Sequence, residues 1–97
     1  MKIKILPSAL DDLRRGRRFY ESQEDGLGDY FQDSLFSDID SLVIYAGIHS
    51  KEFGYFRLLS KRFPFAVYYK LEGEEPAVVY RVLDMRSDPE RRDRKLK

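Results

Sequence analysis

The sequence contains no cysteine. This absence excludes disulfide bonds, thiolate nucleophiles and cysteine metal sites together, so the fold must rest on side-chain packing alone. A chain without cysteine is compatible with a reducing compartment, and we expect a cytoplasmic location. We also predict no metal site and no cofactor.

Long apolar runs are missing as well. No stretch approaches the roughly 20 apolar residues that a membrane-spanning helix needs, and the short apolar stretch after Lys4 is stopped by Pro7. We therefore predict no signal peptide and no membrane partner. At 97 residues the chain is long enough for one modest core and too short for two, so we expect a single domain over residues 1–97.

The chain also lacks an excess of charge of either sign, since its formal net charge is +1. The charges are nevertheless separated along the sequence. From Glu24 to Asp40 every charged residue is acidic, whereas basic residues dominate the later part: Arg57, Lys61, Arg62, Lys70, Arg81 and Arg86. This separation predicts one acidic and one basic face. The alternative is that these residues only solvate the surface.

The first half of the sequence predicts a short strand followed by a helix. Lysine and isoleucine alternate over residues 1–6, and Pro7 ends that strand. Ser8 and Asp11 have the spacing of a capping box, with Asp12 also near the positive end of the helix dipole. The helix should bury a stripe of four residues, on which the glycine would allow another helix to approach closely: Ala9, Leu13, Gly16 and Tyr20.

A second helix should pack antiparallel to the first. Residues 24–28 contain two glycines, which predicts a tight connection. The second helix should end near Gly47, with Asp33, Asp38 and Asp40 facing away from its buried stripe: Phe31, Leu35, Ile39 and Leu42.

Three strands follow, over residues 53–59, 63–71 and 77–83, and their short connections predict an antiparallel meander. The last strand should be central because it is almost continuously apolar. Residues 88–97 are basic with one apolar residue, which predicts a tail that frays or orders against a partner. The expected fold class is α+β, with a short N-terminal strand, an antiparallel helical hairpin and a three-stranded antiparallel meander.

Several segments resemble one known family when their order and spacing are taken together. The hairpin segments 19–21, 26–31 and 34–39 read Phe-Tyr-Glu, Gly-Leu-Gly-Asp-Tyr-Phe and Ser-Leu-Phe-Ser-Asp-Ile. The strand segments 62–69 and 82–89 read Arg-Phe-Pro-Phe-Ala-Val-Tyr-Tyr and Val-Leu-Asp-Met-Arg-Ser-Asp-Pro. Nearly the whole chain resembles the RelE/ParE toxin superfamily, especially its ParE-like plasmid stabilisation branch.

The resemblance implies the toxin of a type II toxin–antitoxin system, neutralised by a cognate antitoxin. ParE-like members inhibit DNA gyrase by binding, whereas RelE-like members cut messenger RNA on the ribosome without a metal. Phe65 stands where RelE-like nucleases commonly have an arginine, and Asp84 stands where many have a histidine. These two departures favour a gyrase inhibitor that is not an enzyme. The alternatives are a RelE-like mRNA interferase and a degenerate, non-toxic interaction module.

Candidate site residues follow from this comparison of activities. RNA cleavage needs proton carriers and cations, but the lone His49 reads as structural or solvent-exposed, and Arg86 should lower the pKa of Asp84. The weak catalytic candidates are Arg57, Arg62, Arg81, Asp84 and Arg86. The residues expected to bind a target or the antitoxin are Arg57, Lys61, Arg62, Arg81, Arg86, Arg91 and Arg92. Tyrosines in the strands should serve packing more than base stacking.

Overall fold

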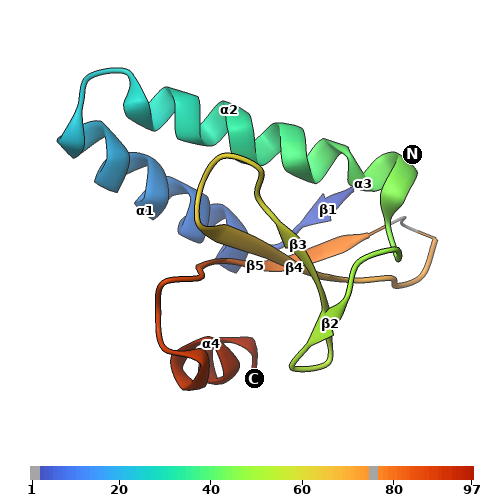
Figure 1. The fold of residues 1–97 in the computed structure, drawn as a ribbon. Coiled ribbons are helices and arrows are strands. Elements are labelled where there is room, and N and C mark those ends of the chain that lie inside the picture. Colours follow the sequence, from blue (N-terminus) through green and yellow to red (C-terminus); the bar gives the residue numbers. More distant parts are fainter. Residues whose placement is uncertain (1–2, 75–76) are drawn as a thin grey trace.

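The computed structural model describes residues 3–74 and 77–97. The hairpin of two long helices covers one face of a sheet, and the last helix lies on the other face (Figure 1). No helix within these residues is long and apolar enough to cross a membrane. The elements in chain order are β1 (Lys4–Ile5), α1 (Pro7–Gln23), α2 (Leu27–Asp40), α3 (Leu42–Tyr45), β2 (Lys51–Glu52), β3 (Tyr55–Leu59), β4 (Phe65–Lys70), β5 (Val78–Asp84) and α4 (Pro89–Leu96).

The strands form one mixed sheet in the order β1-β5-β4-β3-β2. The predicted antiparallel meander of β3, β4 and β5 is confirmed. Two further strands extend the meander, the predicted N-terminal strand β1 on one side and the unpredicted β2 on the other. The N-terminal strand, predicted over residues 1–6, is seen only at Lys4–Ile5, with residues 1–2 outside the described part, and it pairs parallel to β5. Strand β5 therefore has a neighbour on each side.

Strand β2 pairs antiparallel with β3 and is not predicted by the sequence. Its two residues are too few to show a period. The turn between β2 and β3 uses Phe53 and Gly54, whose φ angles of 58° and 83° lie in the left-handed region. The strand predicted from residue 53 consequently begins at Tyr55.

Helix α1 begins without the predicted capping box. Pro7 takes the first helical position, and the preceding Leu6 makes no side-chain cap. Proline suits this position because it has no N–H that would need a partner. The Ser8 hydroxyl instead donates a hydrogen bond to the carbonyl of Tyr80 at 2.8 Å. The predicted stripe of α1 is buried. Asp12 lies on that same stripe rather than at the helix end.

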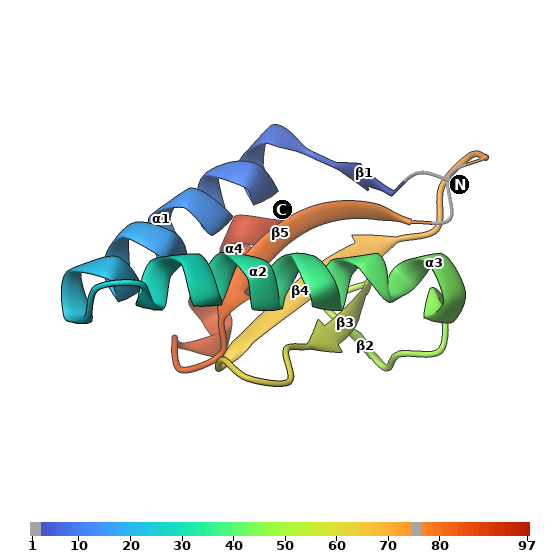
Figure 2. The ribbon, with the colours of Figure 1, turned by 90° about the horizontal axis from the view of Figure 1, so that it is seen from above.

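The two long helices lie side by side across the sheet (Figure 2). Glycines allow close contact between them at two points, since a Cβ at Gly16 would lie 2.5 Å from Cζ of Phe31 and a Cβ at Gly28 would lie 2.6 Å from the carbonyl oxygen of Arg17. The predicted apolar stripe of the second helix is buried, but the helix is interrupted at Ser41 and continues as α3 before Gly47. Asp38, expected to face away, is buried and accepts a hydrogen bond from the Ser60 hydroxyl at 2.7 Å.

Strand β4 is buried on both faces. Phe65, Val67 and Tyr69 pack against the hairpin, as their alternation predicts. Ala66 and Tyr68 pack on the opposite face with other buried side chains, including one from α4. The strand therefore forms the centre of two apolar layers.

Residues 88–97 are not a frayed tail, because most of them form α4. The Asp88 carboxylate caps this helix by accepting a hydrogen bond from the Glu90 N–H at 3.0 Å. Leu96 and Arg92 are buried, and at a spacing of four residues they share one face of the helix. That face docks on the sheet, which the sequence does not indicate because a single leucine carries the apolar contact.

A β-bulge shifts the register of β5. Tyr68 pairs with Arg81, but the next residue, Tyr69, pairs with Val79. Tyr80 is therefore the additional residue, and both Val79 and Val82 remain in the core on the hairpin side. The bulge leaves Arg81 opposite Tyr68, on the face that α4 covers.

Candidate functional site

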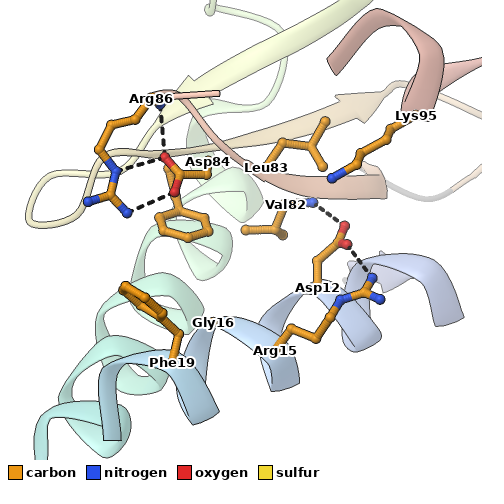
Figure 3. Close-up of a pocket in the computed structure, with 10 residues that line it drawn as sticks. Asp12, Arg15, Gly16, Phe19, Val82, Leu83, Asp84, Arg86 and Lys95 are labelled. Carbon is orange, nitrogen blue, oxygen red and sulfur yellow. Dashed lines mark hydrogen bonds and ion pairs between the residues drawn. The ribbon is translucent and has the colours of Figure 1, made fainter. Parts of the chain in front are cut away.

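A cleft of about 220 Å³ lies between α1, the end of β5 and α4 (Figure 3). Its floor is apolar and consists of Gly16, Phe19, Phe65, Val82 and Leu83. Its rim is charged and consists of Asp12, Arg15, Asp84, Arg86 and Lys95. The hydrogen bonds made by the two carboxylates decide how much positive charge the rim presents.

Asp12 joins α1 to β5. Its carboxylate accepts hydrogen bonds from the Val82 N–H at 2.9 Å and from Nε and Nη2 of Arg81 at 2.7 Å each. Arg15 adds a further bond at 3.1 Å. The Asp12 and Arg81 side chains are 6% and 17% exposed, so the two charges satisfy each other away from water. The hydrogen bonds to Asp12 raise the pKa of Arg81, which acts here as a structural residue.

Asp84 is bound by its neighbour Arg86 at the end of β5. The carboxylate accepts bonds from Nε and Nη2 of Arg86 at 3.0 and 2.8 Å and from the Arg86 N–H at 2.8 Å. Burial favours a higher pKa for Asp84, but these hydrogen bonds outweigh it and lower the pKa below the ordinary value. The predicted direction is confirmed, and a carboxylate of this kind is a poor proton carrier near neutral pH.

Arg57 belongs to a partly buried network under α4. Tyr68 stands between Arg57 and Arg81 in the register of the three strands. The Glu52 carboxylate accepts a hydrogen bond from the Tyr68 hydroxyl at 2.5 Å and one from Arg57 at 3.2 Å. Arg92 lies 3.9 Å from the same carboxylate. Two of the predicted binding arginines, Arg57 and Arg92, are thus brought together around one carboxylate; Arg92 is buried, whereas the Arg57 side chain is 26% exposed.

The remaining predicted cations lie apart from that network. Arg62 and Lys61 are exposed between β3 and β4, and the Arg62 guanidinium is 6.0 Å from the centre of the Tyr30 ring. Arg91 is exposed on α4. The structure therefore divides the predicted basic residues among four places. Arg86 lies on the cleft rim, Arg81 pairs with Asp12, Arg57 and Arg92 lie near Glu52, and Lys61, Arg62 and Arg91 are exposed.

His49 is placed far from Asp84. Its Nδ1 lies 2.5 Å from the Tyr69 hydroxyl, which also accepts a hydrogen bond from the Gly47 N–H at 2.9 Å. Asp84 pairs with Phe65, four residues before Tyr69 and thus about 13 Å along the strand. Burial lowers the pKa of His49. Within residues 3–74 and 77–97, no three His, Cys, Asp or Glu side chains gather as a metal site.

The residues that the sequence interpretation missed are Asp12, Glu52 and Lys95, whereas the arginine run of residues 14–18, which includes Arg15, reads from sequence as an exposed helix surface able to contact an acidic antitoxin segment. One signal could have identified Asp12, because it stands three residues after Ala9 and four before Gly16, on the buried stripe of the helix. Glu52 has no comparable signal, since it lies on a strand of two residues. Arg15 and Lys95 belong to helices far apart in sequence, so only the fold brings them to one rim.

No protein-family model matches the sequence, and no curated protein matches it either. The architecture itself, a helical hairpin and a separate helix on opposite faces of a mixed five-stranded sheet, is an α+β fold (Figure 1). A chain in the structure described as the chromosomal ParDE toxin–antitoxin system from P. aeruginosa matches it with a TM-score of 0.70. The two chains are 22% identical, over 84% of this chain and 92% of the other. The resemblance inferred from sequence is confirmed at the level of the fold.

Proposed function

We propose that this chain is the toxin of a type II toxin–antitoxin system and that a cognate antitoxin neutralises it. The observation that carries this proposal is the fold shared with a ParDE system, over 84% of this chain. We further propose the ParE-like activity, inhibition of DNA gyrase by binding.

The state of the candidate catalytic groups supports binding over RNA cleavage. Cleavage without a metal needs a proton acceptor and a proton donor near the reacting phosphate. Asp84 is bound by Arg86, and His49 is bonded to Tyr69. Arg57 and Arg81 flank Tyr68 on one sheet face, but carboxylates hold both cations.

Two assays with one preparation of purified protein test the activity. In the first, DNA gyrase supercoils relaxed plasmid in the presence of the protein, and we expect inhibition. In the second, translating ribosomes carry a messenger RNA, and we expect the message to stay intact. Cleavage without gyrase inhibition would replace the proposal with a RelE-like nuclease.

Induced expression in a bacterial host tests toxicity itself. Gyrase poisoning should give filamentous cells with an SOS response, whereas a nuclease should stop translation rapidly. Normal growth at a verified level of folded protein would identify a non-toxic interaction module. Co-expression of the protein encoded by the adjacent reading frame should restore growth if that protein is the antitoxin.

A further inference from the structure

The cleft beside α1 has an apolar floor that is open to solvent at one residue. Phe65, Val82 and Leu83 are at most 8% exposed, whereas Phe19 is 49% exposed. The Phe19 ring is supported edge to face by Tyr20, with 5.1 Å between ring centres. A held, half-exposed aromatic ring at the mouth of a cleft is the type of surface that an apolar anchor of a partner buries.

The rim of the cleft carries more positive than negative charge. Arg81 already neutralises Asp12 through two hydrogen bonds, so the charge of Arg15, whose side chain is 62% exposed, remains in excess. Lys95 reaches toward the cleft from α4 (Figure 3), and its ammonium group has no ion pair among the described residues. Arg86 and Asp84 neutralise each other. The cleft is therefore complementary to an acidic segment.

The Tyr20 hydroxyl is a buried polar group near the rim of the cleft. Burial raises its pKa, and its surroundings include Arg86 and Asp84, which act on that pKa in opposite directions. The hydroxyl therefore lies within the influence of the rim charges.

We propose that this cleft binds an acidic segment of the antitoxin, with one apolar side chain against Phe19 and carboxylates against Arg15 and Lys95. The inference rests on the proposed function, because that function supplies the partner. Because the cleft combines a positive rim with an apolar floor, it favours a peptide that carries both carboxylates and an apolar side chain over a nucleic acid. The acidic hairpin of a second copy of this chain is the competing occupant.

The experiment measures binding of the protein encoded by the adjacent reading frame to matched pairs of variants. Phe19→Ser removes the anchor, and Tyr30→Ser is its control because Tyr30 is also 49% exposed but lies outside the cleft. Arg15→Glu reverses a rim charge. Its control is Arg14→Glu, because Arg14 pairs with Asp11 at the same i,i+3 spacing and is equally exposed. Lys95→Glu is compared with Arg94→Glu in the same way.

We expect each cleft variant to weaken binding by about tenfold or more and each control to stay within about threefold of wild type. Unchanged melting temperatures establish that the variants fold. Equal binding by cleft and control variants would overturn this inference and leave the proposed function standing. Failure of the wild-type protein to bind would overturn both. A dimer that only the cleft variants dissociate, with antitoxin binding unchanged, would assign the cleft to self-association instead.

Discussion

A single carboxylate, Asp12, ties the first helix to the fifth strand across 70 residues of sequence. It accepts hydrogen bonds from the buried Val82 N–H and from Nε and Nη2 of Arg81, whose Nη1 donates to the Lys95 carbonyl at 3.1 Å. Removing one partner of a buried ion pair lowers the free energy of unfolding by more than the intact pair contributes to it, because the remaining charge stays buried without compensation. Asp12 is therefore expected to matter for folding more than any exposed acidic residue.

Asp12→Asn should lower the free energy of unfolding by about 3 kcal/mol, since it leaves the Arg81 guanidinium buried beside a neutral amide with one acceptor oxygen in place of a carboxylate. Asp11→Asn is the control, because Asp11 makes the equivalent bond to Arg14 at an exposed position and should cost at most about 0.5 kcal/mol. Urea unfolding monitored by circular dichroism measures both. Equal losses for the two variants would contradict the structural role of the buried pair.

Tyr68 should make stability depend on pH in the alkaline range. Burial, and then the hydrogen bond to Glu52, raise the pKa of Tyr68 to about 12, whereas an unfolded tyrosine has a pKa of about 10. Between these values the folded state holds a proton that the unfolded state has lost. The stabilisation is therefore complete below pH 10 and is lost as pH rises through 12, by up to ~1.4 kcal/mol per pH unit.

Urea unfolding of the wild type and of Tyr68→Phe from pH 9 to pH 12 isolates this contribution. The wild type should lose stability more steeply than Tyr68→Phe above pH 10. Tyr45→Phe serves as the control because Tyr45 is 51% exposed. Parallel curves for wild type and Tyr68→Phe would show that the hydroxyl is not held protonated by the fold.

At the scale of the elements, glycine and aromatic residues set the distance between the two long helices. Phe31 is fully buried, and its ring contacts Tyr20, Phe63 and Phe65 with centres 5.0 to 5.1 Å away. A ring enclosed on these sides has little room to move. The absent side chain of Gly16 is therefore part of the packing, and the hairpin would separate if that space were filled.

Gly16→Ala should destabilise the protein by about 1–3 kcal/mol through overpacking. Helix propensity alone predicts the opposite sign, a gain of about 1 kcal/mol, so the sign of the change decides between the two effects. The measurement is the urea midpoint. Gly16→Ala combined with Phe31→Leu should recover part of the loss, and a stabilised single variant would show that the helices can separate without cost.

At the scale of the whole molecule, folding pairs many of the charges that the sequence separates. Acidic residues of the hairpin meet arginines, as Asp29 does with Arg17 at 2.6 Å. Arg57, Arg81 and Arg86 each meet a carboxylate. The basic face expected from composition is thereby reduced to local sites, and the cleft beside α1 retains positive charge next to apolar surface.

His49→Gln should leave growth arrest by the expressed protein intact, because His49 is bonded to Tyr69 and lies far from Asp84, which pairs with Phe65 toward the other end of β4. Arg57 lines a pocket with His49 but is held by Glu52. Tyr69→Phe is the matched variant, since it removes the same hydrogen bond while keeping the imidazole. Both should lower stability by about 1 kcal/mol. If only His49→Gln abolished toxicity at normal stability, the imidazole would be acting chemically and the nuclease interpretation would return.

The sequence by itself determined the helical stripes, the alternation of β4 and the antiparallel meander, because these depend on local periodicity and short connections. It also carried the family resemblance. Only the tertiary structure decided the parallel pairing of β1, the docking of α4 and the partners of Asp12. Each of these depends on contacts between segments far apart in the chain, and a single residue such as Leu96 or Asp12 has no period that reveals its partner. The cleft that Arg15 and Lys95 share is a property of the assembled fold for the same reason.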